Sequence, residues 1–273
     1  MKQFRFLLLC LLLLGWSAGA QTSREELLSH IELTAGNYAN YPNPTGHITP
    51  APKGYEPFYI SHYGRHGARY QTSDKAYKRL QHQLDTALSL GLLTEYGKDV
   101  RNRITLAAAD AKGRAGSLTQ LGARQHKAIA KRMYDNYPTH MTKPLTVTAN
   151  ASTSRRVIHS MENFCEELKE LNPAYDITMA AREEDLYYIK ANKKINVPDS
   201  PTEDELYHKL KKFRKKMLEW TPQMNAIFTD PDKAKSFIDA YTFADDLYNV
   251  AADMYCIKSM GCSNSLYCDT VAC

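Results

Sequence analysis

Two arginines and a histidine surround one glycine in residues 65–69, which read Arg65-His66-Gly67-Ala68-Arg69. Planar guanidinium groups match the oxygens of a phosphate, and glycine lets the backbone approach closely or take a positive φ. Flanking positive charge favours the neutral imidazole, whose free nitrogen can attack phosphorus while the arginines stabilise the transition state. The group therefore predicts an anion site that contains a nucleophile. The alternative is a basic surface loop, because short motifs often match by chance.

The surrounding pattern places this group where a strand ends. The apolar run before it predicts a buried strand over residues 58–61, and a second strand is predicted over 145–149, just before Arg155 and Arg156. Strands separated by helices imply an α/β fold with a mainly parallel sheet, whose ligands gather where the strands end. Both arginine groups are therefore expected at one sheet edge. Periodicity and capping residues also predict helices over 74–90, 95–112, 119–137 and 157–171, and a short strand over 176–179.

The rest of the chain is predicted to be helical or irregular. A helix opens at Ser23 and stops at Gly36, and the proline-rich residues 41–57 are irregular. Thr202 begins a long helix with six basic residues between positions 209 and 216, and residues 234–252 are helical. We interpret this region as a helical cap. The basic run is a solvated helix face, or alternatively it attracts a polyphosphorylated ligand.

The first twenty residues have the pattern of a secretory signal peptide. A basic start, a leucine-rich run too short to span a bilayer and an Ala18-Gly19-Ala20 end predict cleavage near Ala20 and a secreted or periplasmic protein. Removing Lys2 and Arg5 with this segment lowers the formal net charge from +5 to about +3. So small an excess does not indicate nucleic acid but is compatible with an anionic small molecule.

The cysteines and the changes of character suggest four regions. Cys165 stands alone, whereas four cysteines crowd into the last eighteen residues without the spacing of zinc ligands. The predicted organisation is a signal peptide at 1–20, an α/β core at 21–200 with a helical insert at about 74–137, a helical segment at 201–255, and an atypical cysteine-rich tail at 256–273. That tail could be a disulfide knot or non-native coding sequence.

With these residues laid out, the chain resembles the histidine acid phosphatase family. Residues 65–69 match the family hallmark, in which the histidine accepts the phosphoryl group. Residues 116–126 are similar to a second family segment that leads into a helix, and residues 152–156 to the strand end that supplies a third phosphate-binding arginine. The resemblance runs from about Tyr55 to the region of Asp253. Tyr70 and the lysine-rich helix are most similar to the multiple inositol polyphosphate phosphatases, which include secreted bacterial phytases.

The resemblance implies a fold, a reaction and a role for each matching residue. The fold would be that of phosphoglycerate mutase, a mainly parallel sheet flanked by helices with an α-helical cap. The reaction would be phosphate hydrolysis from inositol polyphosphates without a metal or cofactor, by a monomer that binds a small anionic substrate, binds no nucleic acid and does not insert stably into a membrane. His66 would be the nucleophile. Phosphate would be bound by Arg65, Arg69, Arg156 and Thr72, with Arg155 and Tyr70 as weaker candidates.

Two departures from the family pattern bear on activity. Gln71 stands where the hallmark usually continues to proline, which removes one rigid ring. Beyond Arg156 the sequence lacks the histidine followed by a carboxylate, commonly His-Ala-Glu, that protonates the leaving alcohol, so the general acid is unknown. The chain therefore resembles a truncated phosphatase, and residues 256–273 would fit a frameshifted tail. The alternatives are a non-catalytic phosphate-binding remnant and an enzyme similar to phosphoglycerate mutase.

Overall fold

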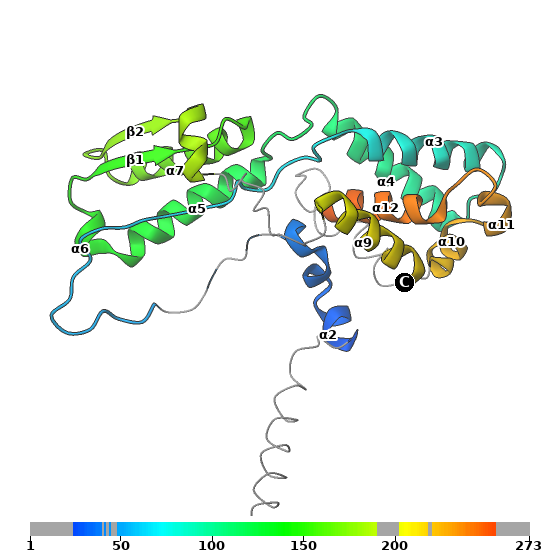
Figure 1. Cartoon of the computed structure of the whole chain (residues 1–273), viewed down its shortest axis with the longest axis horizontal. Helices are drawn as coiled ribbons and strands as arrows, with labels where there is room; N and C mark the ends of the chain where they lie inside the picture. Colours follow the sequence, from blue (N-terminus) through cyan, green and yellow to red (C-terminus); the bar gives the residue numbers. More distant parts are fainter. Residues whose placement is uncertain are drawn as a thin grey trace, which may run out of the picture.

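The computed structural model describes residues 24–39, 41, 44, 48–189, 202–217 and 220–254, and its elements form two packed groups (Figure 1). Within the described ranges, two segments cross from one group to the other. One group, the α/β half, contains the sheet. The other, the helical half, is built of helices alone. The predicted signal peptide and cysteine-rich tail lie outside the described residues.

The α/β half is a two-stranded parallel sheet with helices packed against it. Strands β1 (Thr146–Asn150) and β2 (Asp176–Ala180) pair in parallel, and α7 (Arg155–Leu171) crosses between them. Helix α7 packs on both strands and on α5 (Gln120–Asn136), which ends before the short α6 (Pro138–Met141). The predicted α/β class is confirmed, and a proline at the start of α6 is compatible with a first helical turn.

A small hydrophobic cluster holds this half together. Ala130, Met141, Leu168 and Tyr175 are its buried members, and the Tyr175 hydroxyl donates a hydrogen bond to the Met141 carbonyl. Cys165 of α7 is buried and unpaired, and burial raises its thiol pKa to about 11. A thiol that stays protonated is a structural residue rather than a reactive one.

The helical half is built on two antiparallel helices. Helices α3 (Lys75–Ser89) and α4 (Glu95–Ala111) pack on each other; α12 (Ala240–Met254) packs on α3, and α10 (Thr221–Ile227) on α4. The short α11 (Pro231–Ala234) lies between α10 and α12 in the sequence. The expected single helix over 234–252 is therefore wrong in its first part, because the chain leaves the helical path between α11 and α12.

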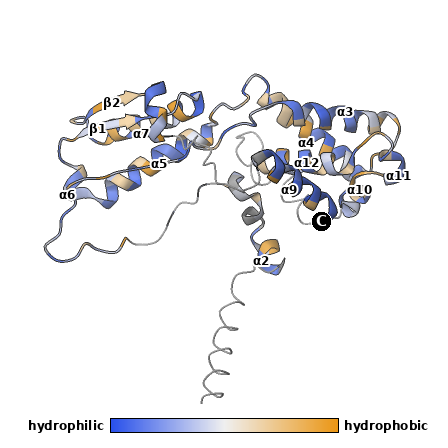
Figure 2. Cartoon of the chain, in the orientation of Figure 1, coloured by the Kyte–Doolittle hydropathy of each residue, from blue (hydrophilic) through white to orange (hydrophobic). Residues whose placement is uncertain are grey.

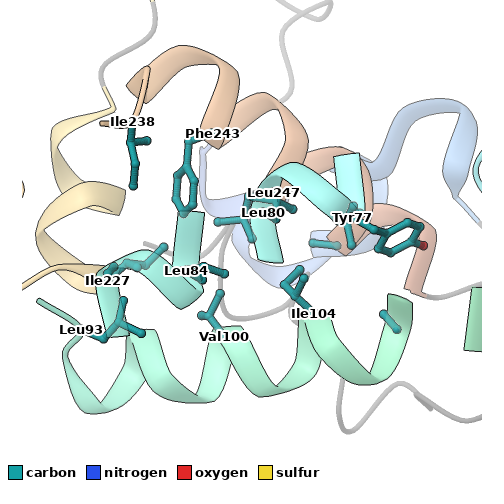
Figure 3. Packing of buried hydrophobic residues seen from close by; sticks show 14 of the residues in the cluster. Tyr77, Leu80, Leu84, Leu93, Val100, Ile104, Ile227, Ile238, Phe243 and Leu247 are labelled. Atoms are coloured by element: carbon teal, nitrogen blue, oxygen red, sulfur yellow. The ribbon is translucent and has the colours of Figure 1, made fainter. Parts of the chain in front are cut away.

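Apolar side chains at helical spacing fill the centre of this half. They project from α3, α4 and α12 toward one another (Figure 3). The fully buried members include Leu80, Leu84, Val100, Ile104, Ile227 and Phe243. Large-to-small changes at such positions typically cost about 2–5 kcal/mol, so this core is the main stabilising feature of the helical half.

The remaining helices lie mostly at the surface, although Ala35 of η1 is buried in the core of the helical half. Helix α9 (Glu203–Met217) begins with the expected capping box, in which Glu205 Oε2 accepts from Thr202 N at 2.8 Å and Glu205 N donates to Thr202 Oγ1 at 3.2 Å. Its described side chains are exposed, and α3 and α9 carry mainly hydrophilic residues (Figure 2). The other short pieces are α2 (Arg24–Ser29), the 3-10 segments η1 (Ile31–Tyr38) and η2 (Glu183–Asp185), and α8 (Leu186–Ile189).

The expected buried strand over residues 58–61 is wrong. The segment has no strand pairing, and Phe58 and Tyr59 are 92% and 74% exposed. An apolar run becomes a buried strand only where other elements cover its faces. In the described part of the chain β1 pairs with β2 alone, and a cavity rather than a ladder of hydrogen bonds separates β1 from residues 58–60.

No helix in the described ranges is long and apolar enough to cross a membrane.

Candidate functional site

The loop at residues 65–69 lies where the chain passes from the α/β half to the helical half, and the α/β half holds its centre. The Gly67 amide donates to Ser160 Oγ of α7 at 3.1 Å, and the Ala68 amide donates to Gln125 Oε1 of α5 at 2.9 Å. Two consecutive backbone amides are therefore fixed by side chains from two different helices. This anchoring sets the position of His66, which immediately precedes them.

The second half of the loop runs antiparallel to residues 116–119. The Tyr70 amide donates to the Ser117 carbonyl at 2.9 Å, the Gly116 amide donates to the Gln71 carbonyl at 2.7 Å, and Arg69 forms an isolated antiparallel bridge with Leu118. Among the described residues, these two segments cross between the halves. The loop is thus part of a short two-stranded ribbon even though the expected strand before it is absent.

Close backbone approach explains the glycine within the loop. A Cβ on Gly67 would lie 2.5 Å from the Gly122 carbonyl oxygen, and a Cβ on Gly122 would overlap the carbonyl oxygen of Ala68. The sequence suggests two roles for Gly67, a close backbone approach or a positive φ. The structure shows the close approach, and Gly67 is not among the glycines with positive φ in the described residues. The loop therefore packs directly on the first turn of α5.

The His66 ring is oriented by its own loop. Its Nδ1 lies 2.8 Å from the Gly67 carbonyl oxygen, which can only accept, so Nδ1 carries the hydrogen and Nε2 of the neutral ring keeps its lone pair. Burial lowers the His66 pKa below 6.5, and the charges of Arg156, Arg65 and Arg69 lower it further, against the opposing effect of the Gly67 hydrogen bond. Burial thus contributes more to the neutral form than the flanking arginines emphasised by sequence reasoning.

The arginines differ in their surroundings. Arg156 is half-buried, and its Nε is buried without a hydrogen-bond partner in the part of the chain that the structure describes, whereas Arg155 is exposed. Arg69 is half-buried, donates from Nη1 to the Tyr70 carbonyl at 3.0 Å, and lies 5.8 Å from the ring centroid of Tyr38. Buried donors that lack a partner carry a desolvation cost, which an incoming anion would relieve. Of the two neighbouring candidates, Arg156 is therefore the one placed beside His66.

Arg155, the exposed neighbour of Arg156, provides a matched control for the position of Arg156 beside His66. Replacing Arg156 with glutamine is expected to raise the His66 pKa, because it removes a nearby positive charge. Arg155→Gln removes the same charge from the adjacent, exposed residue and is expected to have a smaller effect. NMR titration of the His66 ring measures both. A larger rise in Arg155→Gln than in Arg156→Gln would contradict the placement.

The remaining candidates are less closely associated with His66. Tyr70 is buried toward the helical half, where its hydroxyl donates to Asp110 Oδ2 at 3.0 Å and accepts from Arg114 Nη1 at 2.8 Å. Thr72 is exposed, and its Cα and the Arg156 guanidinium both lie close to Gly116. The loop, Arg156 and Thr72 are thus brought to one region, while the Tyr70 hydroxyl is occupied elsewhere.

Two cavities meet at His66. One of about 510 Å³ is lined by the loop together with Tyr38, Tyr41 and Gln125, and the other, of about 430 Å³, lies between residues 58–60 and β1. Both are lined by Arg65, His66 and His126. Burial lowers the pKa of His126, so a second neutral imidazole flanks the site. The two cavities thus form an open cleft that contains the neutral His66 and is lined by Arg65 and Arg69, while Arg156 lies near enough for its charge to lower the His66 pKa.

Two contributors to this region were not found by sequence reasoning. Tyr38 of η1 lies against Arg69, and Asp253 of α12 accepts a hydrogen bond from the Gln71 amide at 3.0 Å. A buried acid in the apolar run Val250-Ala251-Ala252-Asp253-Met254 was the available signal for the second. Nothing in the local sequence distinguishes Tyr38 from the other tyrosines.

The fold and the cleft together define an α/β protein with a histidine at the centre of an arginine-lined cleft. The family model of the histidine phosphatase superfamily (branch 2) matches residues 64–259. The chain belongs to this superfamily. A comparison with curated proteins finds no match.

Solved structures of one bacterial enzyme share the fold. The apo form of the Bifidobacterium longum multiple inositol polyphosphate phosphatase superposes with a TM-score of 0.52 at 20% identity, covering 78% of this chain and 58% of that one. Its complexes with inositol hexasulfate and with phosphate give TM-scores of 0.51 and 0.50, both at 19% identity, covering 81% and 82% of this chain and 60% and 62% of theirs. The chain thus spans less than two thirds of the length of these structures.

Proposed function

We propose that this chain is a phosphomonoesterase that removes phosphate from inositol polyphosphates through a phosphohistidine on His66. The observation that carries the proposal is the Nδ1 contact with the Gly67 carbonyl, which leaves the Nε2 lone pair available beside three arginines. Membership of the histidine phosphatase superfamily supports the reaction class. The similar solved structures, which include complexes with phosphate and with inositol hexasulfate, support the substrate class.

The proposed reaction has two steps. His66 Nε2 bonds to phosphorus while the bond between phosphorus and the substrate oxygen breaks, and its electron pair leaves with that oxygen. Arg65, Arg69 and Arg156 bind the other phosphate oxygens, with Thr72 as a further donor. Water then attacks the phosphohistidine, the N–P bond breaks, and inorganic phosphate leaves as neutral imidazole is restored. Across both steps water supplies one proton to the alcohol and its oxygen to phosphate.

The leaving alcohol determines how much catalysis this chain can provide. An inositol alkoxide needs a proton as it leaves, whereas p-nitrophenolate is stable without one. General acid catalysis typically contributes about 10²–10⁴-fold, and no residue of this sequence is assigned to it. That observation favours the second candidate function, a phosphate-binding protein without efficient turnover.

One pair of measurements separates these functions. Phosphate release from phytate and from p-nitrophenyl phosphate is measured alongside calorimetric binding of inositol hexasulfate, a non-hydrolysable analogue. Turnover of phytate supports the proposed activity. Turnover of p-nitrophenyl phosphate alone supports the nucleophile without a general acid, and binding with no turnover of either substrate favours the second function. If the protein neither binds inositol hexasulfate nor turns over either substrate, both candidate functions are overturned.

Location and assembly complete the proposal. The first twenty residues support export with cleavage near Ala20, and the modest net charge supports a small anionic substrate rather than nucleic acid. We propose a monomer that acts outside the cytoplasm. The basic residues of α9 are exposed and would attract a polyphosphorylated substrate through long-range charge.

A further inference from the structure

A buried carboxylate of the helical half binds the backbone just beyond the loop at residues 65–69. Asp253 of α12 is fully buried, and its Oδ2 accepts from the Gln71 amide at 3.0 Å. The Gln71 side chain donates from Nε2 to the Asn249 carbonyl, one helical turn earlier, at 2.8 Å. The Gln71 carbonyl accepts from Gly116 on the opposite side. Gln71, two residues after Arg69, is therefore fixed by its amide, its carbonyl and its side chain.

Asp253 is also electrostatically linked to the site. Burial raises its pKa to about 7, while the charge of Arg69, the Gln71 amide and the Tyr77 hydroxyl of α3 favour the ionised form. Farther along the same helix interface, Arg79 of α3 pairs with Asp246 of α12 at 2.7 Å. From η1, the ring of Tyr38 lies against the Arg69 guanidinium. The charge of Arg69 therefore acts both on Asp253 and on any anion bound in the loop at residues 65–69.

We propose that Asp253 is a positioning residue that holds Gln71, two residues after Arg69, in place and takes up a proton when an anion binds the loop at residues 65–69. The inference rests on the proposed function only in taking residues 65–69 as an anion site. It does not depend on turnover or on the identity of the alcohol.

The direction of the coupling follows from charge. A bound phosphate or sulfate brings negative charge near the carboxylate and competes with it for Arg69, and like charge favours protonation. Proton uptake on binding means that binding tightens as the pH falls through about 7. If the bound anion raises the carboxyl pKa by about one unit, binding at pH 6.5 is about sixfold tighter than at pH 8.5, with roughly half a proton taken up at pH 7.5.

The experiment measures proton uptake with anions that do not titrate in this range. Binding of inositol hexasulfate and of inorganic sulfate to the full chain is followed by calorimetry from pH 6.5 to 8.5, in buffers of different ionisation enthalpy. Wild-type protein should take up a proton with either probe. Asp253→Asn keeps the shape of the side chain and an oxygen that can accept from Gln71, and it should abolish most of the uptake near pH 7.5.

A matched variant and the histidines supply the controls. Asp245→Asn removes a half-buried acid from the same helix about two turns earlier and should leave proton uptake unchanged. His62, His66 and His126, all with lowered pKa values, contribute least above pH 7, and their share remains in Asp253→Asn. Uptake that is equal in wild type and Asp253→Asn, or absent from wild type, overturns the proposal, as does binding of neither probe. Sulfate binding with Asp253-dependent uptake but no hexasulfate binding supports it and counts against the proposed substrate class alone.

Discussion

Replacing His66 with alanine is expected to lower phosphate release by at least about 10³-fold, because the proposed mechanism assigns the covalent intermediate to His66 alone. Binding of inositol hexasulfate should change much less, since Arg65, Arg69 and Arg156 remain. The expected pattern is therefore loss of turnover with retained affinity. Substrate binding without His66 would rest on the three arginines and Thr72.

The assay uses p-nitrophenyl phosphate, whose leaving group needs no proton, with calorimetry on the same preparations. His159→Ala is the matched control, because His159 lies on the exposed side of α7 and makes no expected contact with substrate. Acid-labile phosphate on the wild-type chain, located by mass spectrometry after a rapid quench, should map to His66. Turnover of either phosphate ester that survives His66→Ala would contradict the nucleophile assignment and the proposed mechanism with it.

The helices could be predicted closely because their signals are local. Threonine caps begin α4 and α5, and the Thr202–Glu205 capping box begins α9, within a residue of the expected starts. The helical periodicity of α3 and α7 reports the buried stripe that each helix presents to its neighbours. These patterns depend on residues three or four positions apart, which a single sequence contains in full.

The strand expected over 58–61 could not be judged in this way. Its apolar run satisfies the local rule, but whether such a run pairs depends on elements distant in sequence that cover it. In the described residues, β1 has its partner on the β2 side, and Phe58 remains exposed. The pair β1 and β2 was predicted correctly because α7 connects them as a short crossover unit.

The site shows the same division between local and distant information. The hallmark loop and the neighbouring Arg155 and Arg156 are visible in the sequence, and strand-end logic brings them together. The preference for Arg156 follows from which face of the first turn of α7 meets the loop. Asp253 is 182 positions from Gln71 in the sequence, so the hydrogen bond from the Gln71 amide to Asp253 could not be inferred without the fold. Burial likewise has the largest effect on the His66 pKa and depends on the complete packing.

A Thr-x-x-Gly pattern at the start of α4 and of α5 explains how the loop is seated. Thr119 caps α5 by accepting from the Gly122 amide at 3.1 Å, and its own amide donates to the Ala68 carbonyl at 2.9 Å. Thr94 caps α4 in the same way through Gly97, and its amide donates to the Ile227 carbonyl at 3.0 Å. In each case a carbonyl oxygen rests on the positive end of a helix, where a glycine leaves room for it.

Gly122→Ala and Gly97→Ala are therefore expected to lower the free energy of unfolding by similar amounts. Helix propensity alone would make each change stabilising by up to about 1 kcal/mol, but each new Cβ overlaps a carbonyl oxygen, and overpacking typically costs about 1–3 kcal/mol. The sign of the change, measured by urea unfolding of each variant, shows which effect is larger. A stabilised variant would mean that the carbonyl can move away at little cost.

The two variants should differ in function, since only one of the displaced carbonyls, that of Ala68, belongs to the loop at residues 65–69. Gly122→Ala pushes on Ala68 and is expected to weaken inositol hexasulfate binding by about tenfold or more, because misplaced arginine forks lose their paired contacts with the anion. Gly97→Ala pushes on Ile227 in the helical half, and its folded fraction should bind as wild type does. Calorimetry on both variants under conditions where each is folded makes the comparison. Wild-type affinity in a folded Gly122→Ala variant, or equal losses in the two, would show that the seating of the loop on α5 does not set the arginine geometry.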